Sequence, residues 1–528
     1  LATQLCCWVA ASGFMSYSVV WFKKDLRLHD HAALQQALAT GPVLCVFCVE
    51  PHLWRQADAS TQHYRFVIEC LRDLWSELRS VGLKLHVVTA DAPDFLARLF
   101  AASPFKRLYS HQETGNGASF QRDIAVARWC RAHGVAWHEV PQFGVQRGSA
   151  NRDAWSRHWH GHMSLPQSTL PTASAHDTVP LPWVEPPPPD ALTLGLQQPD
   201  KSRRQAGGRA IALQLLRSFI ADRSRQYRGG ISSPLRAVDA CSRLSPYLTW
   251  GCLSVREVWQ AVQYRRASEA PPAPKHLAGL NAFGSRLHWH CHFIQKLESE
   301  PGIEFHNMHR GYDGLRESEH KPEHFAALVS GRTGWPLVDA CVAMLRETGW
   351  INFRMRAMLV SVAAYPLWLH WRPVGEWLAT EFLDYEPGIH WSQMQMQSGT
   401  TGINTARIYN PIKQARDQDP EGRFVREWLP AMRKVPDTWL FEPWRMPAEM
   451  QLRCGLRVGG PDADIPTPLV DLERATRLAK VRLFALRAQP EVKAAKAAIV
   501  RQHGSRTFVR KRGGKVPPVA VPAQLELL

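Results

Sequence analysis

Short apolar runs alternate with amphipathic stretches of helical periodicity along the first part of the chain. The runs predict strands at 18–22, 42–49, 84–89 and 107–110, and the amphipathic stretches predict helices at 31–39, 62–81 and 117–133. This alternation is typical of a doubly wound sheet of parallel strands, which binds ligands beyond the carboxyl ends of its strands. The sequence therefore predicts an α/β domain over 16–150, although it contains no G-x-G-x-x-G or P-loop fingerprint.

The pattern changes twice after this domain. Residues 151–205 lack regular periodicity and include four consecutive prolines, 186–189, which favour a semi-rigid, extended linker. Helical periodicity then continues over 206–488, which predicts an all-α second domain. The stretch 489–528 is a basic tail, either disordered in solvent or an arm that attracts phosphates. Residues 1–15 are predicted to be an extra N-terminal segment and not a signal peptide.

The charge balance favours a polyanionic partner. The chain of 528 residues carries a net charge of +17, and basic side chains that contact phosphates release condensed counterions. Nucleic acid is the first candidate and an anionic membrane surface the second, while no apolar run is long enough to span a membrane. Cys45 and Cys48 lie in an apolar run that indicates a buried strand, so no metal site is predicted there. We expect a soluble cytoplasmic protein, nucleoid-associated if bacterial.

Charged residues interrupt an apolar, aromatic-rich helical stretch near position 356. Arg356 lies among Met355, Ala357 and Met358, where an unpaired guanidinium would be costly. Asp384 and the nearby Glu386 are the obvious partners. The pattern indicates either an internal polar cofactor or a structural ion pair between two packed helices.

Six motifs in a fixed order resemble the photolyase/cryptochrome family, over roughly residues 18–487. The first, at 20–30, is V-W-F-K-K-D-L-R-L-H-D, close to the family pattern W-F-R-x-D-L-R-x-x-D. The others are S-R-L-S-P-Y-L at 242–248, G-W-P-L-V-D-A at 334–340, G-W at 349–350, R-I-Y-N-P at 407–411 and F-V-R-E-W-L-P at 424–430. The resemblance implies an α/β domain joined by a long linker to an all-α FAD-binding domain.

The resemblance also implies the cofactor residues. FAD would be held by Tyr227, Cys241, Ser242, Arg243, Leu244, Ser245, Arg356, Asp384, Tyr385, Glu386 and His390. Cys241 stands where the family usually has Thr, and His390 falls near flavin N5, where photolyases usually carry Asn. A second, antenna chromophore of the folate, deazaflavin or lumazine type would occupy the α/β domain.

The implied chemistry is light-driven repair, in which reduced, excited flavin gives an electron to a pyrimidine dimer that has left the base stack. Trp289 would form a wall against the lesion, Trp371 would belong to an electron relay, and His390 would tune the flavin. UV-damaged DNA, duplex or single-stranded, would be contacted by Arg286, Trp289, Phe353, Arg354, Arg407, Lys413 and Gln414.

Several positions depart from the family pattern. Arg286, Met396, Phe353 and Ala357 replace lesion-facing residues, so the usual cyclobutane-dimer activity is open. Met394 occupies the flavin-proximal relay position, and Ser318 and Glu319 fall near the distal one; Trp368, Trp391, Tyr365 and Tyr385 are candidate replacements. The sequence predicts a photolyase-like lyase. The alternatives are a cryptochrome that binds FAD and signals through a partner, and a flavin-free nucleic-acid-binding protein.

Overall fold

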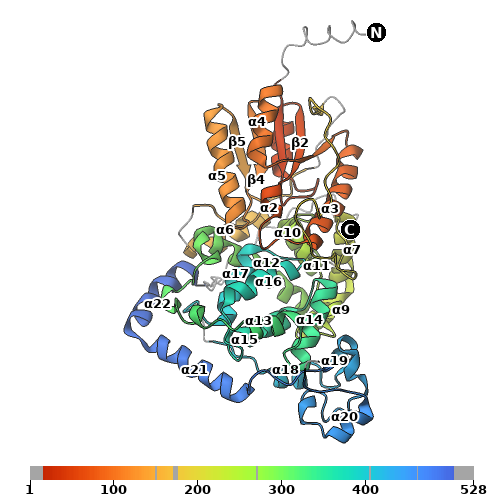
Figure 1. Ribbon diagram of the computed structural model, residues 1–528. Coiled ribbons are helices and arrows are strands. Elements are labelled where there is room, and N and C mark those ends of the chain that lie inside the picture. The colour runs from red at the N-terminus through yellow and green to blue at the C-terminus, as the bar shows by residue number, and fades with distance from the viewer. Residues whose placement is uncertain are drawn as a thin grey trace.

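The chain folds into an α/β domain followed by a larger helical domain, which lies below it in Figure 1. The computed structural model describes residues 16–148, 152–169, 177–268, 272–403, 406–460 and 462–504. The predicted segment 1–15 and the last part of the predicted tail, 505–528, lie outside these ranges. No helix in the described ranges is long and apolar enough to cross a membrane.

Five parallel strands form the sheet of the α/β domain in the order β3-β2-β1-β4-β5. They are β1 (Ser18–Phe22), β2 (Val43–Val49), β3 (Leu85–Thr89), β4 (Arg107–His111) and β5 (Ala136–Val140). The chain starts at the central strand and winds first to one side and then to the other. The predicted doubly wound fold is therefore confirmed, and its switch point lies between β1 and β4.

Helices cover both faces of this sheet. They are α1 (Ala32–Leu38), α2 (Pro51–Trp54), α3 (Thr61–Ser80), α4 (Ala92–Ala102) and α5 (Gly117–Ala132). Cys45 packs in the core on the α3 side, whereas Cys48 packs in the core on the α4 side. The two thiols of the C-x-x-C spacing thus lie on opposite faces of the sheet, as the alternation of side chains along a strand requires.

Two elements were missed in the sequence. β5 is an edge strand with no fully buried residue, so it lacks the apolar run that marks a buried strand. Helix α6 (Arg152–Ser164) lies inside the predicted linker, so this stretch is helical and not irregular. It buries Trp155, Trp159 and Met163 at intervals of four residues, a helical pattern that the sequence did carry.

The helical domain surrounds one long central helix, α12 (Pro274–Ser299), which packs against α8, α11 and α17. The other helices before residue 400 are α7 (Arg209–Ser218), α8 (Ser224–Gly230), α9 (Ala237–Ala240), α10 (Ser245–Thr249), α11 (Val255–Ala267), α13 (Pro322–Ser330), α14 (Pro336–Thr348), α15 (Phe353–Ala364), α16 (Trp371–Glu381) and α17 (Pro387–Ser398). A π-helical turn, Phe219–Arg223, joins α7 to α8, and short 3-10 turns follow α12. After residue 400 come α18 (Pro411–Gln418), α19 (Arg423–Trp428), α20 (Ala448–Cys454), α21 (Leu472–Ala488) and α22 (Pro490–His503).

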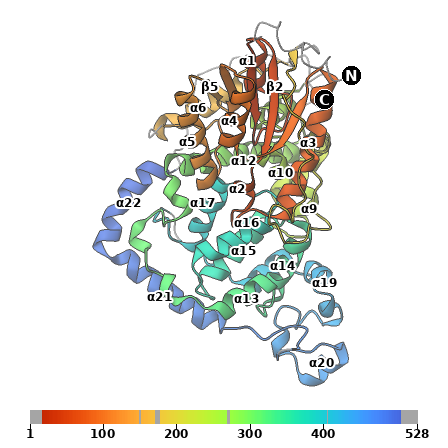
Figure 2. The ribbon, with the colours of Figure 1, turned by 45° about the horizontal axis from the view of Figure 1, so that its top comes forward.

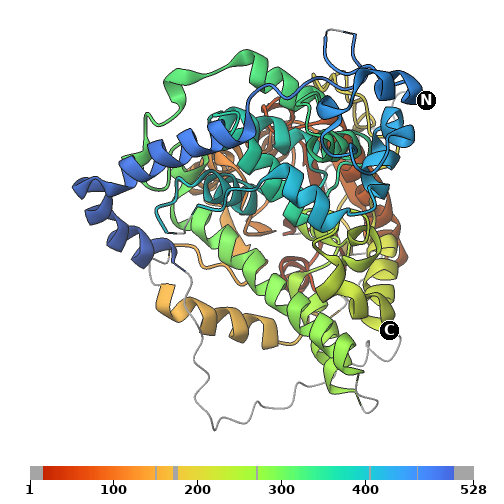
Figure 3. The ribbon, with the colours of Figure 1, turned by 90° about the horizontal axis from the view of Figure 1, so that it is seen from below.

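The last two helices run along the outer side of the helical domain (Figures 2 and 3). Of the two alternatives for the stretch from 489, disorder in solvent does not hold over α22, which is folded and attached. His309 Nε2 donates to the carbonyl of Val492 at 2.9 Å, and His503 Nε2 bonds to Glu300 at 2.6 Å. These contacts fix both ends of α22 on the helical domain.

The turn after β1 joins the two domains. The backbone N–H of Leu26 donates to the carbonyl of Trp250 at 3.0 Å, and Arg27 donates to the carbonyl of Gly251 at 3.0 Å. Ser254 donates to Asp30 Oδ2 at 2.6 Å. Gly251 has a φ of +67°, and a Cβ there would lie 2.3 Å from the carbonyl oxygen of Lys24, so only glycine fits. The W-F-K-K-D-L-R-L-H-D motif thus forms an interdomain contact.

Candidate functional site

The charges that interrupt the apolar stretch form one ion pair. Arg356 on α15 binds Asp384 through two hydrogen bonds of 2.9 and 3.1 Å, and its Nε donates to the carbonyl of Ile351 at 2.8 Å. Burial would raise the pKa of Asp384, but Arg356 and the Ser245 hydroxyl outweigh it and hold that pKa below its usual value. Asp384 is therefore an anion that fixes the guanidinium in place.

The segment 241–245 lies against this pair. Arg243 has a φ of +63° and stacks its guanidinium 3.8 Å from the ring centre of Trp350. Burial lowers the pKa of Arg243 to about 10, with smaller effects from Cys241, Asp384 and Arg356. Leu244 is buried in front of α10, and the Ser242 hydroxyl accepts from its N–H at 3.4 Å.

Arg223, which the sequence analysis missed, holds this segment from behind. It donates to the carbonyl oxygens of Cys241 at 2.5 Å and Ser242 at 3.3 Å. Nothing in a single sequence marks one arginine among many as the partner of a distant loop. Its position in the π-helical turn between α7 and α8 brings it there.

Tyr227 lies on α8 within a group of aromatic rings. Its ring centre is 5.5 Å from that of Phe219 and 5.9 Å from that of Phe283. Burial raises the pKa of its hydroxyl, and the other groups that act on it are Cys241 and Arg286. Tyr227 therefore lies within electrostatic range of Cys241 and of Arg286.

The charged groups that act on Glu386 are not those of the Arg356–Asp384 pair. Burial raises the pKa of its carboxyl to about 7, and the charged groups that act on it are Lys24 and Glu113 of the α/β domain. Its Oε1 is buried without a hydrogen-bond partner in the described part of the chain. The carboxyl thus faces the domain interface and not the ion pair.

His390 starts a row of ring contacts on α17. Its Nε2 lies 2.9 Å from the carbonyl oxygen of Gly375, so Nε2 carries the proton and Nδ1 keeps a lone pair. Burial lowers the pKa of His390 to about 4, which makes the ring neutral near pH 7. The ring centre of Trp391 is 4.9 Å from that of His390 and 5.9 Å from that of Trp371.

The residues predicted to contact DNA lie on several elements. Arg286 and Trp289 are one turn apart on α12, and Trp289 contacts the ring of Phe293 at 5.6 Å. Phe353 at the start of α15 is 53% exposed, which is unusual for a phenylalanine. Arg354 beside it donates to Gln414 at 3.4 Å, which joins α15 to α18. Exposed Arg407 and Lys413 lie in and near the segment that leads into α18.

A pocket lies between the two domains at the carboxyl ends of β1, β2 and β4. It has about 790 Å³ free of protein atoms, including its opening to solvent. Its lining is rich in aromatic rings and in charges of both signs: Trp21, Phe22, Phe47, Trp54, Trp250, Tyr385, Lys23, Lys24, Arg122, Glu50, Asp58 and Glu113. We call it the interdomain pocket. Its place agrees with the ligand position expected for a doubly wound sheet.

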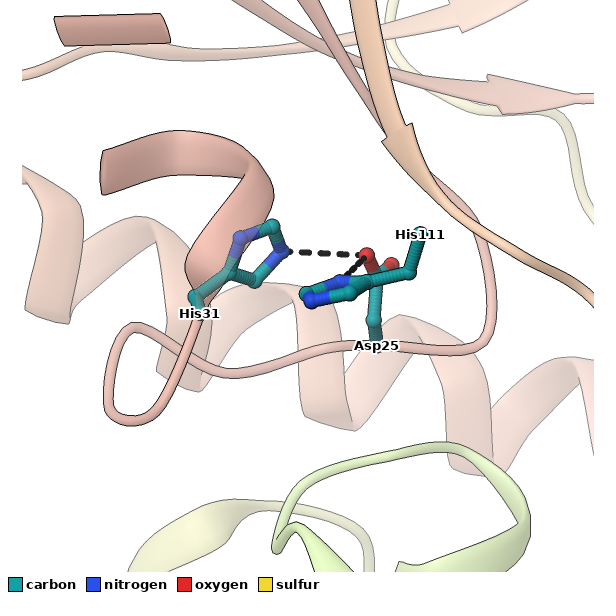
Figure 4. Close-up of side chains that lie close together, drawn as sticks. All are labelled: Asp25, His31 and His111. Atoms are coloured by element: carbon teal, nitrogen blue, oxygen red, sulfur yellow. Dashed lines mark hydrogen bonds and ion pairs between the residues drawn. The ribbon is translucent and has the colours of Figure 1, made fainter. Parts of the chain in front are cut away.

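Asp25, His31 and His111 form a buried cluster at the end of β1 (Figure 4). His31 Nε2 is 3.0 Å and His111 Nδ1 2.8 Å from the same oxygen of Asp25. His31 Nδ1 accepts from the backbone N–H of Leu34 at 3.0 Å, so its proton must be on Nε2 and faces Asp25. To bind a metal, His31 would need a lone pair on Nε2, where it carries a proton. The cluster is therefore arranged for hydrogen bonding.

Comparison with known proteins agrees with this architecture. Residues 18–143 match the family model described as DNA photolyase, and residues 283–484 match the FAD binding domain of DNA photolyase. A deoxyribodipyrimidine photo-lyase of Alkalihalophilus pseudofirmus is 25% identical over 86% of this chain and 95% of its own. A cryptochrome DASH of Gloeobacter violaceus is 27% identical over 86% of this chain and 93% of its own.

A solved structure shares the fold as a whole. It is an archaeal photolyase from Sulfolobus tokodaii with two FAD molecules, with a TM-score of 0.70 and 24% identity over 89% of this chain and 99% of that one. The helical domain, the ion pair and the two family models define a flavoprotein of the light-driven class. The chain belongs to the photolyase/cryptochrome family.

The start of α15 fits a polar cofactor. Asn352 donates to the carbonyls of Ile231 and Ser232, but its Oδ1 is buried and has no partner in the described residues. An unsatisfied buried acceptor is costly, so the Asn352 Oδ1 at the start of α15 fits an FAD that supplies a partner.

Proposed function

We propose that this protein is an FAD-dependent, blue-light-driven photolyase-like enzyme that acts on UV-damaged DNA. The observation that carries the proposal is the first turn of α15. Arg356 points inward and is fixed by Asp384, whereas Phe353, three residues earlier, is 53% exposed beside Arg354. One helical turn therefore connects a cofactor partner to a surface with the aromatic and cationic groups that bind single-stranded nucleic acid.

The residues would hold FAD in distinct ways. Arg356 and Asp384 would bind the ring edge, the backbone near Ser242 and Ser245 would meet the pyrophosphate, and Tyr227 would cover the adenosine side. When bound and reduced, FAD supplies the electron that a light-driven dimer cleavage needs. His390 is neutral, so it would offer the ring only a hydrogen-bond acceptor at Nδ1, because its Nε2–H is already given to Gly375.

The DNA partner is supported by charge as well as by Phe353. The net charge of +17 favours phosphate binding, and Arg286, Arg407 and Lys413 are exposed cations that would contact the DNA backbone. An extruded lesion would pass Trp289 to reach the flavin. Damaged base pairs cost less to extrude than intact ones, which would give selectivity.

A second chromophore would fit the interdomain pocket. Its aromatic walls suit a flat ring, and Lys23, Lys24 and Arg122 suit an acidic group on it. The related archaeal photolyase holds two FAD molecules, with the implication of a light-harvesting cofactor in that protein. Extraction of the purified protein followed by chromatography would identify a folate, a deazaflavin, a lumazine or a flavin in excess of one per chain.

The deciding experiment is repair. Purified holoprotein is mixed with cyclobutane and 6-4 dimers in duplex and single-stranded DNA, under blue light and in the dark. Light-dependent loss of either lesion supports the photolyase-like function. A yellow protein that binds DNA but repairs no lesion in the light would overturn it in favour of a cryptochrome, and a colourless one would overturn the flavin as well.

The cryptochrome alternative has its own observation. Arg286 stands where the family usually has a Glu that bonds a cyclobutane dimer, and it is engaged with the Tyr227 hydroxyl. Ala357 and Met396 add no polar group that a thymine carbonyl could use. These replacements favour either a different lesion or a photoreceptor without repair.

A further inference from the structure

Trp391 lies next to Trp371, although the other two positions of the family's usual tryptophan relay carry no tryptophan in this chain. Both rings are almost completely buried, and their centres are 5.9 Å apart. Met394, at the position where the family has its flavin-proximal tryptophan, packs beside Trp391 against Gly375. The row His390, Trp391, Trp371 is therefore continuous without the usual residue.

Trp371 cannot be the end of this row. It is 1% exposed, and its Nε1 donates to the amide oxygen of Asn307 at 2.8 Å. An amide oxygen is too weak a base to take the proton of an oxidised indole. The Asn307 amide in turn donates to Asp313 at 2.8 Å, so it is already committed. A stable end point has to be found elsewhere.

Tyr385 lies at the other end of the same group of rings. Its ring centre is 5.1 Å from that of His390, and its hydroxyl donates to Asp58 Oδ2 at 2.7 Å. Burial, followed by the Asp58 carboxylate, raises the pKa of this phenol well above its ordinary value. The phenolic proton is held in place and has one ready acceptor, a carboxylate.

Both members of this pair are reachable from outside. Tyr385 and Asp58 are half-buried and line the interdomain pocket, which opens to solvent. Asn116 also donates to Asp58 Oδ2 at 2.8 Å, which keeps the carboxylate aimed at the hydroxyl. A small reductant can therefore reach Tyr385 while the pocket holds no chromophore, in contrast to the enclosed Trp371 and Trp391.

We propose that Tyr385 and Asp58 form the terminal electron donor of a relay that runs through Trp391 and ends in the interdomain pocket. The proposal rests on the proposed flavin function. One electron passes from Trp391 to photoexcited, oxidised flavin, and one electron passes from Tyr385 to Trp391. The Tyr385 proton moves to Asp58, which leaves a neutral tyrosyl radical, and a soluble thiol restores the phenol by giving a hydrogen atom.

Trp368 provides the matched control. It is a buried tryptophan of the same domain, but it packs between Arg316 and Arg482 in the cluster that includes Tyr312, Tyr365 and Leu483. Its indole N–H donates to Glu319 at 3.3 Å. Replacing Trp368 with Phe should remove an indole from the domain without touching the row at His390.

The test compares holoprotein variants W391F, Y385F, D58N and W368F under blue light with a soluble thiol. Flavin content is first read from the visible spectrum, and light-induced radicals are then identified by electron paramagnetic resonance. W391F should slow flavin photoreduction by at least about tenfold. Y385F should replace the tyrosyl signal by an indolyl signal. In the wild type, formation of the tyrosyl radical should be slower in D₂O than in H₂O, because a proton moves to Asp58. D58N should lower the tyrosyl yield and abolish this solvent isotope effect. W368F should match the wild type.

Three results would overturn the proposal: photoreduction of W391F at the wild-type rate, a tyrosyl signal that survives in Y385F, or slowing in W368F alone. These failures leave flavin binding intact and so leave the proposed function standing. A wild-type protein that holds no flavin would fail before the relay is reached, and that result would contradict the proposed function itself.

Discussion

The turn after β1 and the start of α15 both bury charge, but they treat it differently. In the turn, Asp25 accepts from the backbone of Lys23 at 2.6 Å and from His111 at 2.8 Å, and His31 Nε2 lies 3.0 Å from the same carboxylate, all within the α/β domain. At α15, Arg356 is paired with Asp384, yet Asn352 keeps a buried amide oxygen without a partner in the described residues.

The difference separates a structural motif from a binding site. A cluster whose charged groups lie against one another gains little from a ligand, whereas a buried acceptor without a partner is stabilised by whatever supplies a donor. The motif around Asp25 is the strongest sequence signature, but its contacts hold the two domains together. The less distinctive stretch near Arg356 carries the features of the site.

We call Asp25 with His31, His111 and the Lys23 N–H the closed network. Removing its carboxylate should have the largest effect. D25A would remove the acceptor of two buried hydrogen bonds and the carboxylate that faces His31, which should lower the free energy of unfolding by about 3 to 5 kcal/mol. D25N keeps one acceptor oxygen and should lose less. Urea unfolding measures both, and flavin per folded chain should not change. Loss of flavin from folded D25N would contradict the assignment of this cluster to structure alone.

We call the start of α15, with Asn352 and the Arg356–Asp384 pair, the open region. Breaking it should lower the flavin content of the protein. D384A leaves Arg356 without its counter-charge, which should cost about 2 to 3 kcal/mol, below the range for fully buried pairs because Arg356 is partly exposed. The visible spectrum of the purified protein should show little flavin, and D384N should retain more. Full flavin occupancy in D384A would mean that the pair is only an ion pair between helices.

The closed network also predicts a pH dependence. Burial lowers the pKa of His111 to about 3, against about 6.5 in the unfolded chain. As the pH falls through this window the unfolded chain takes up a proton that the folded chain does not, so stability from this group is lost progressively below pH 6.5. H111N, which keeps a donor toward Asp25, should lose less stability than the wild type between pH 7 and 5. Equal losses would show that His111 does not titrate on unfolding.

The sequence predicted the sheet well where strands are buried. β2 is apolar in all seven residues and was predicted with an extra residue at one end. β5 was missed because an exposed edge strand carries no apolar run. The helical character of α6 was visible in its tryptophans, but their spacing was overlooked in a stretch dominated by prolines further along. α22 was missed because its surface is basic and its burial depends on contacts with α12 and the turn at His309.

The candidate site was predictable only in part. The Arg356–Asp384 pair follows from the cost of burying a lone guanidinium, which is a property of the sequence itself. The surroundings of Glu386 could not be predicted in this way, because they depend on how the α/β domain packs against α17. The Trp391–Trp371 contact likewise needs the crossing of α16 and α17, which no spacing in one helix reveals.

The smallest effect is expected at the exposed edge of the open region. Phe353 is 53% exposed, and stacking of one base on an aromatic side chain is worth about 1 to 3 kcal/mol. F353A should therefore weaken binding of single-stranded or dimer-containing DNA by about 1 to 2 kcal/mol, with flavin content unchanged. Fluorescence anisotropy at several salt concentrations measures this, and the salt slope should stay the same because no charge is removed.

The α/β domain supplies a matched control for this variant. Trp75 on α3 is 44% exposed and has Arg79 against its ring, so it also presents an aromatic group with a cation to solvent. W75A should leave DNA affinity unchanged, because α3 belongs to the α/β domain whereas α15 lies in the helical domain (Figures 1 and 2). Equal weakening by W75A and F353A would mean that exposed aromatic residues bind DNA wherever they lie. The assignment of the lesion-binding surface to the start of α15 would then be wrong.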